Sequence, residues 1–168
     1  MSRRLLLLLA ALPLLAPAQK ISIEFDETRD FSDFRTFAIA GGAIHSKNPS
    51  LNNEIVQKNI EAEIRRRMAE KGFTEVQARP DLNVRYSLGS NRVAQREAYP
   101  AGWRGWGTRV VTTHFTEGTL VIDLRDPAKH ALVWRAIAVE DKADPLRIKD
   151  HLADMVRKSI EKYPPKKQ

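Results

Sequence analysis

The sequence contains no cysteine among its 168 residues, and aromatic residues make up only 7% of it. Without a thiol, the chain cannot form a disulfide, bind a metal through thiolates, use a cysteine nucleophile or carry a lipid on a cysteine. Acidic residues are also in the minority, because the chain has 21 of them and 28 lysines and arginines. The absence of cysteine therefore excludes thiol chemistry and cysteine-linked membrane anchoring.

The chain also lacks an apolar run long enough to cross a bilayer. Its longest one, Leu5–Leu15, follows two arginines and precedes the small residues Ala16–Ala18. A membrane-spanning helix needs about 20 apolar residues, whereas a basic start, a short apolar core and a small-x-small end are typical of a secretory signal peptide. We predict that residues 1–18 are a signal peptide, that the mature chain starts at Gln19 and that the protein is periplasmic. An uncleaved N-terminal anchor is the alternative.

The net charge is positive, and the predicted processing reduces it. Loss of residues 1–18 leaves 26 of the 28 basic side chains against 21 acidic ones, so the net charge falls from +7 to +5. A basic surface often indicates a nucleic-acid partner, but export separates the protein from nucleic acid. We therefore predict no nucleic-acid partner. Acidic envelope polymers, anionic lipid headgroups or simple solubility explain the charge instead.

Common catalytic and metal-binding motifs are missing too. The four histidines are scattered along the chain at His45, His114, His130 and His151. They lack metal-ligand spacing, and no Gly-x-Ser-x-Gly elbow or phosphate-binding loop occurs. His151 and Asp154 lie one helical turn apart, which favours a surface pair over a metal site. We predict no metal, no cofactor and no catalytic residue, so the protein is expected not to be an enzyme.

Alternating apolar and polar residues predict the strands. The predicted strands cover residues 20–26, 37–39, 73–76, 82–88, 109–126 and 131–140. The strand at 109–126 is expected to bulge near Gly118, and residues 41–50 are expected to form a loop. Trp134 falls on the apolar side of the last strand, which predicts a core position.

A four-residue spacing of apolar side chains predicts two helices. The first runs from about Leu51 to Lys71, capped by Asn48 or Ser50 and ended by Gly72. Its predicted apolar stripe is Val56, Ile60, Ile64 and Met68, with Ile55 beside it. The second begins with Asp144 as its cap, and its predicted stripe is Ile148, Leu152, Met155, Val156 and Ile160.

The element order is strand, strand, helix, several strands, helix, without the regular strand–helix alternation of a parallel sheet. We therefore predict a single α+β domain over residues 19–168. Its sheet is antiparallel or mixed, with about five strands, and both helices pack on one face.

The segment 118–136, GTLVIDLRDPAKHALVWRA, is predicted to be a hairpin of this sheet. Its apolar alternation predicts Ile122 opposite Trp134 and Leu124 opposite Leu132. The same parity places Asp123 and Arg135 on the other, solvated face, diagonal to each other, as an ion pair.

Residues 89–108, GSNRVAQREAYPAGWRGWGT, show no periodicity and are predicted to form a long hairpin connection. Its aromatic and basic residues are of the types enriched in binding hot spots, and we select Tyr99, Trp103, Arg104 and Trp106 as the candidate ligand or partner site. The alternative is that the rings fold back over an open end of the sheet.

Five segments occur in a recognisable order: DFSDFRTFAI, EKGF, PDLNVRY, EGTLVIDLRDPAKHALVWRA and IEKYPP. Their order and spacing resemble the domain of unknown function (DUF) 4136 family of bacterial envelope proteins, over about residues 20–165. The resemblance implies an exported α+β domain, most members being predicted lipoproteins. It implies no activity and no catalytic residue. The chain departs from the pattern in lacking a lipobox cysteine, which favours a soluble periplasmic form.

We therefore predict an exported, non-catalytic binding or envelope-maintenance module whose partner is an unknown envelope protein or glycan. One alternative is a hydrolase acting on envelope glycans, with Asp123 or Glu97 as its acid. Another is a structural lipid-surface protein that contacts an anionic membrane surface weakly through Lys166 and Lys167.

Overall fold

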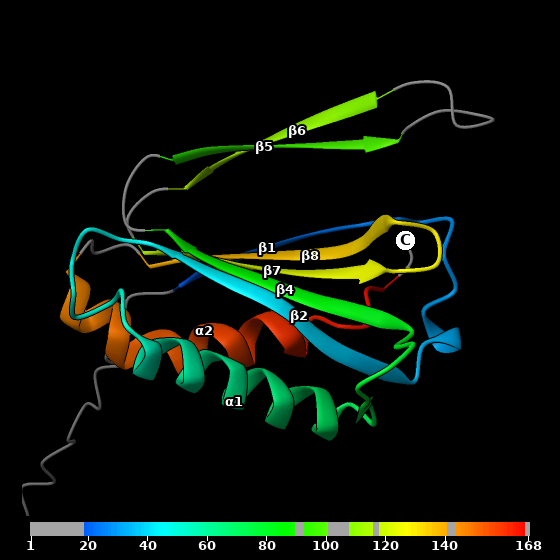
Figure 1. Cartoon of the computed structure of the whole chain (residues 1–168), viewed down its shortest axis with the longest axis horizontal. Helices are drawn as coiled ribbons and strands as arrows, with labels where there is room; N and C mark the ends of the chain where they lie inside the picture. Colours follow the sequence, from blue (N-terminus) through cyan, green and yellow to red (C-terminus); the bar gives the residue numbers. More distant parts are fainter. Residues whose placement is uncertain (1–18, 90–92, 101–107, 116–117, 141–143, 167–168) are drawn as a thin grey trace, which may run out of the picture.

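The computed structural model describes residues 19–89, 93–100, 108–115, 118–140 and 144–166. The predicted signal peptide therefore lies outside the described residues. A sheet forms the middle of the fold, with two helices on one face and a separate β-hairpin over the other (Figure 1).

Six strands form one mixed sheet in the order β1-β8-β7-β4-β2-β3. Their bounds are β1 Lys20–Phe25, β2 Thr36–His45, β3 Thr74–Glu75, β4 Leu82–Gly89, β7 Thr119–Asp126 and β8 Ala131–Val139. β2 pairs in parallel with β3 and β4, whereas the other neighbours are antiparallel. The predicted α+β class is confirmed, with a mixed sheet of six strands rather than about five.

Two further strands, β5 (Val93–Pro100) and β6 (Thr108–Phe115), form a separate antiparallel sheet. The predicted single strand at 109–126 is wrong, because this stretch is divided between β6 and β7. Gly118 separates them with a φ of 84°, and its N–H donates to Gly89 O at 3.0 Å. A left-handed residue redirects the chain, although strand-forming residues lie on both sides of it.

The second strand is longer than predicted. β2 continues into the first half of the expected loop at 41–50, and its pairing with β4 extends to His45 opposite Gly89. A register shift between Ile39 and Gly41 marks a β-bulge, and a Cβ on Gly42 would lie 1.9 Å from Tyr86 Cζ. The two glycines therefore serve a bulge and a close ring contact inside a strand, rather than a loop.

The helices α1 (Glu54–Glu70) and α2 (Pro145–Glu161) lie side by side on one face of the sheet (Figure 1). Their predicted apolar stripes are buried, but Ile55 is 68% exposed. The predicted caps of α1 are wrong: Asn53 Oδ1 accepts from Val56 N at 3.0 Å, while Asn48 Oδ1 accepts from Ser50 N in a turn before the helix. Asp144 is confirmed as the cap of α2.

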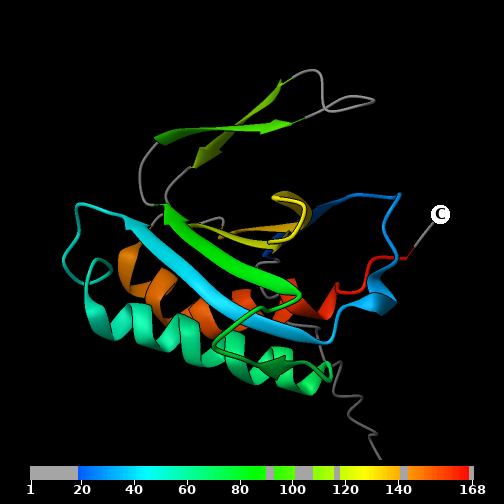
Figure 2. The same ribbon diagram turned by 45° about the vertical axis from the view of Figure 1, so that its right-hand side comes forward.

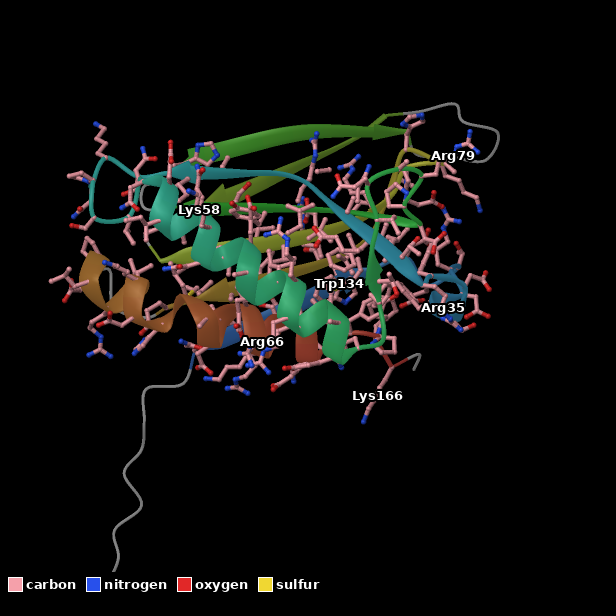
Figure 3. All side chains as sticks on the ribbon, turned by 60° about the horizontal axis from the view of Figure 1, so that its bottom comes forward. Arg35, Lys58, Arg66, Arg79, Trp134 and Lys166 are labelled. Carbon is pink, nitrogen blue, oxygen red and sulfur yellow. The ribbon has the colours of Figure 1, made fainter. Side chains whose placement is uncertain are left out.

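The core lies between the helices and the sheet, with Trp134 fully buried within it (Figure 3). Tyr163 packs edge-on against Trp134 and Phe31, with ring centroids 5.8 and 5.6 Å apart. The predicted register of the β7–β8 hairpin is wrong by two residues, because Leu124 lies opposite Trp134. A register shift between Leu124 and Arg125 lies nearer the turn, and simple alternation did not include it.

Candidate functional site

Charged side chains form a row across the sheet face that lies away from the helices. The row runs through Glu24 in β1, Arg135 in β8, Asp123 in β7 and Arg85 in β4, and it ends at Gly41 in β2. Directly paired residues of neighbouring strands point to the same face, so these charges are neighbours. Their signs alternate as far as Arg85.

The centre of the row is a buried ion pair. Arg135 Nε donates to Asp123 Oδ1 and Arg135 Nη2 donates to Asp123 Oδ2, both at 2.7 Å. Asp123 is 7% exposed and Arg135 is 3% exposed. The predicted pair is therefore present, but its residues are directly opposite rather than diagonal, and buried rather than solvated. The β5–β6 hairpin lies over this face of the sheet (Figure 1).

Arg85 is the next cation along the row, and it is exposed. It lies opposite Asp123 in the register, yet both oxygens of that carboxylate accept from Arg135. No carboxylate in the described ranges forms an ion pair with Arg85. On its other side lies Gly41, where an added Cβ would meet no atom within 4 Å. The row thus ends in a cation beside open space.

A cavity of about 240 Å³ occupies this place. Its lining comes from three strands: Ala40, Gly41, Gly42 and Ala43 of β2, Arg85, Tyr86 and Ser87 of β4, and Val121 and Asp123 of β7. The glycines expose backbone, and the side chains of Arg85 and Ser87 supply a cation and a hydroxyl. The cavity is slightly smaller than typical small-molecule pockets of about 300–1,000 Å³, so it suits one side chain or one sugar unit.

Tyr86 belongs to the cavity lining but is directed towards the helices. Its hydroxyl donates to Glu61 Oε1 of α1 at 3.2 Å. Burial first, and then the nearby Glu61 carboxylate, raise the pKa of Tyr86 above its usual range. The phenol therefore stays protonated and joins β4 to α1 as a structural contact.

Of the four sequence-selected residues, Tyr99 alone lies in the part of the chain that the structure describes. Tyr99 is in β5, opposite Arg109 of β6. Trp103, Arg104 and Trp106 lie outside the described residues, so their role in binding stays a prediction. Arg85 was missed as a candidate. Alternation in β4 places it on the face away from the core, but no local signal reveals that its cross-strand partner is engaged elsewhere.

His151 has a different partner from the predicted one. Its Nδ1 lies 2.8 Å from Glu140 Oε2, whereas Asp154 pairs with Arg157 and Lys158. Burial raises the pKa of Glu140, but hydrogen bonds from His151 and Gln19 outweigh it, so the pKa lies below its usual range. Within the described ranges, no three His, Asp or Glu side chains are arranged to hold a metal ion.

The part of the chain that the structure describes also contains no helix long and apolar enough to span a membrane. A second cavity, of about 600 Å³, lies between β1 and the end of α2. It is lined by Ile23, Phe25, Glu27, Glu161, Lys162, Pro164 and Lys166. Its lysines and glutamates balance each other, so its charge favours neither sign of ligand.

Comparison with known proteins gives a family and a fold. The sequence model of the domain of unknown function DUF4136 matches residues 21–165. No curated protein matches the chain.

Among solved structures, a PDZ domain protein from Parabacteroides distasonis is similar, with 18% identity and a TM-score of 0.53 over 88% of this chain. The match covers 36% of that protein, so this chain spans about a third of its length, and the likeness shows the fold alone. Two structures of the PelC dodecamer from Paraburkholderia phytofirmans are 9% identical, with TM-scores of 0.48 and 0.43. They cover 85% and 83% of this chain and 95% of their own.

Proposed function

Because the chain belongs to the DUF4136 family, a family defined by a domain of unknown function, we propose that it is an exported, non-catalytic binding module of the bacterial envelope. We place its ligand site on the sheet face away from the helices. One observation supports this most: the cavity of about 240 Å³ there contains Arg85, a cation without an ion-pair partner among the described residues. The partner is an envelope protein or glycan.

The two faces of the sheet differ in what they leave accessible. The face under the helices is filled by apolar side chains, including Leu82, Val84, Ile122 and Leu124. The other face has a cavity whose polar groups are carried by strands β2, β4 and β7. Groups on paired strands are held in place before a ligand arrives, which limits the entropy lost on binding. Such a preformed polar site suits recognition.

Asp123 in the cavity lining and Asp126 at the end of β7 both have structural partners. Both oxygens of Asp123 accept from Arg135, which favours the charged form and opposes a role as a proton donor. Asp126 accepts from the backbone N–H groups of Ala128 and Lys129 and pairs with Arg29 at 3.2 Å. A glycan hydrolase needs a protonated acid that touches its substrate. These two aspartates therefore favour binding over hydrolysis.

A pull-down from envelope extract tests the binding part of the proposal. Ser87→Phe fills the cavity, whereas Asn83→Phe is the matched control, on the same face of β4 but outside the lining. We expect a protein or glycan that co-purifies with the wild type and with Asn83→Phe but not with Ser87→Phe. Equal recovery with all three proteins would contradict a site in this cavity.

The export part rests on the pattern of residues 1–18 and has its own test. Cell fractionation and N-terminal mass analysis of the expressed full chain should find a periplasmic protein that starts at Gln19. An intact N-terminus in the cytoplasmic fraction would refute export, and an intact N-terminus in the membrane fraction would favour the uncleaved anchor.

A further inference from the structure

We propose that the ligand of this cavity is an extended acidic peptide segment of a partner protein. The segment adds a strand to the free edge of β2 and places a glutamate or aspartate carboxylate beside Arg85. The inference rests on the proposed function, because it uses the same cavity. It adds the class of ligand, the way it docks and the residue that selects it.

Among the strands that the structure describes, none pairs with one side of β2 over most of its length. One side of the strand pairs with β4 as far as His45, but the other side pairs with β3 only at Thr36 and Phe37. Beyond Phe37, no described strand pairs with that side, and Ala40, Gly41 and Gly42 are exposed. Figure 2 shows β2 running along the border of the sheet. An edge of this kind presents unpaired N–H and C=O groups to an incoming strand.

The two edges of the sheet are protected differently. β1, at one edge, has Lys20 and Glu24 exposed, and charges of this kind discourage pairing with foreign strands. β2 has no charged residue and no proline between Ala38 and Ile44. Its irregularity is the bulge at Ala40, followed by Gly41 with a φ of 148°, so the regular segment beyond it is Gly42 to Ile44, which contains no charged residue. That segment lies directly at the cavity.

The charge row defines which side chain the added strand carries. A residue paired beside Gly41 extends the row of Asp123, Arg85 and Gly41 by one position. Since adjacent strands are ~4.8 Å apart, its Cα lies roughly 10 Å from that of Arg85, within reach of two long side chains. Gly41 has no side chain in between, and the space above it is open. A carboxylate there continues the alternation of charge signs along the row and can accept two parallel hydrogen bonds from the guanidinium.

A peptide fits this site better than a glycan does. The free edge offers backbone donors and acceptors at a two-residue interval, which an extended peptide matches and a sugar chain does not. The cavity of about 240 Å³ accommodates one side chain beside that edge. A basic or neutral side chain would leave Arg85 without its counter-charge.

A random heptapeptide display library tests the inference without knowledge of the partner. The baits are the mature protein, Arg85→Gln and the matched control Arg79→Gln, which changes an exposed arginine that also lacks a described ion pair and lies outside the cavity lining. We expect the wild type and Arg79→Gln to enrich peptides with a Glu or Asp at a fixed position between β-formers. No enrichment, or enrichment of peptides without an acid, would overturn the inference.

Synthetic copies of an enriched peptide then measure the charge contact. We expect affinity to fall at least about tenfold when its acid becomes Gln or when Arg85 becomes Gln, as for the loss of a charge-assisted hydrogen bond. Hydrogen exchange should show added protection, in the complex, of those amides between Gly41 and His45 that point to the open edge rather than to β4. If an oligogalacturonate binds through Arg85 without this protection, the ligand is a glycan and the peptide inference is overturned.

The failure of this inference is distinguishable from that of the proposed function. If Ser87→Phe leaves binding unchanged, the cavity is not the binding site, and the proposed function is overturned. Binding that Ser87→Phe abolishes but Arg85→Gln leaves unchanged overturns only the acidic-peptide inference.

Discussion

The face of the sheet under the helices buries almost only apolar side chains, whereas the opposite face buries an ion pair. Leu124 and Trp134 lie opposite each other on the first, and Asp123 and Arg135 lie opposite each other on the second. The first pair is stabilised by removal of apolar surface from water. The second must offset the loss of hydration of two charges by its paired hydrogen bonds.

The β7–β8 hairpin therefore contributes apolar side chains to the core on one face and positions charged side chains on the other. Replacing a buried ion pair by apolar residues is often neutral or stabilising, so the pair of Asp123 and Arg135 is weak evidence for a role in stability. Its geometric effect is clearer. By accepting both bonds from Arg135, Asp123 leaves Arg85 available beside the cavity.

The largest expected effect is on the apolar face. Trp134→Ala should lower the free energy of unfolding by about 3–5 kcal/mol, because it removes a fully buried side chain and leaves a void. Urea denaturation followed by circular dichroism measures this. A loss below about 1 kcal/mol would show that the core does not depend on the ring.

Asp123→Asn tests the polar face and should destabilise by about 3 kcal/mol, since it leaves the Arg135 charge buried without its counter-charge. The double variant Asp123→Leu with Arg135→Met should regain most of that loss. If the double variant is less stable than Asp123→Asn, the ion pair stabilises the fold in its own right and the contrast between the faces fails.

Gly42→Ala should destabilise by about 1–3 kcal/mol, because its Cβ would overlap the Tyr86 ring at 1.9 Å from Cζ. The same change in a Tyr86→Leu background is the control and should have a smaller effect. Equal penalties in both backgrounds would indicate that the backbone of β2, and not the ring, requires glycine.

The Glu140 carboxylate should make stability depend on pH at the acidic end. Its pKa is lowered in the folded state, so its stabilising contribution is present above the unfolded pKa of about 4.3 and is lost as the pH falls through the folded value. The stability difference between the wild type and Glu140→Gln should therefore shrink as the pH falls from 6 to 3. A constant difference across that range would contradict the lowered pKa.

Arg85→Gln should have the smallest effect on stability, within about 0.5 kcal/mol, because the side chain is exposed and lacks a described ion pair. Thermal unfolding measured beside Arg79→Gln checks this. A clearly larger loss for Arg85→Gln would give Arg85 a structural role and weaken its role in binding.

Alternation along single strands predicted which residues share a face, because a period of two is a local property. It placed Leu82, Val84 and Tyr86 inward and Asp123 and Arg135 together. It did not predict the register, because one bulge in the β7–β8 hairpin shifts every pair beyond it. Arg85 was missed for the same reason, since its availability depends on contacts made two strands away.

The glycines led to a wrong prediction in β2, and the effect of Gly118 on the path of the chain was not predicted. In β2, Gly41 and Gly42 indicated a loop, although a bulge and the Tyr86 ring require small residues inside a strand. Gly118, with a φ of 84°, directly precedes β7, and the strand-like stretch at 109–126 is divided between two sheets. Both outcomes depend on tertiary neighbours, which local propensity does not contain.

The most direct test of the central claim is a nuclear magnetic resonance titration of the ¹⁵N-labelled mature protein with the display-selected acidic peptide. We expect the amide shifts of β2 and β4 to change around Gly41, Arg85 and Ser87, while those of the buried helix face around Ile64 and Met155 stay in place. Shifts confined to α1 and α2, with β2 and β4 unchanged, would contradict the central claim.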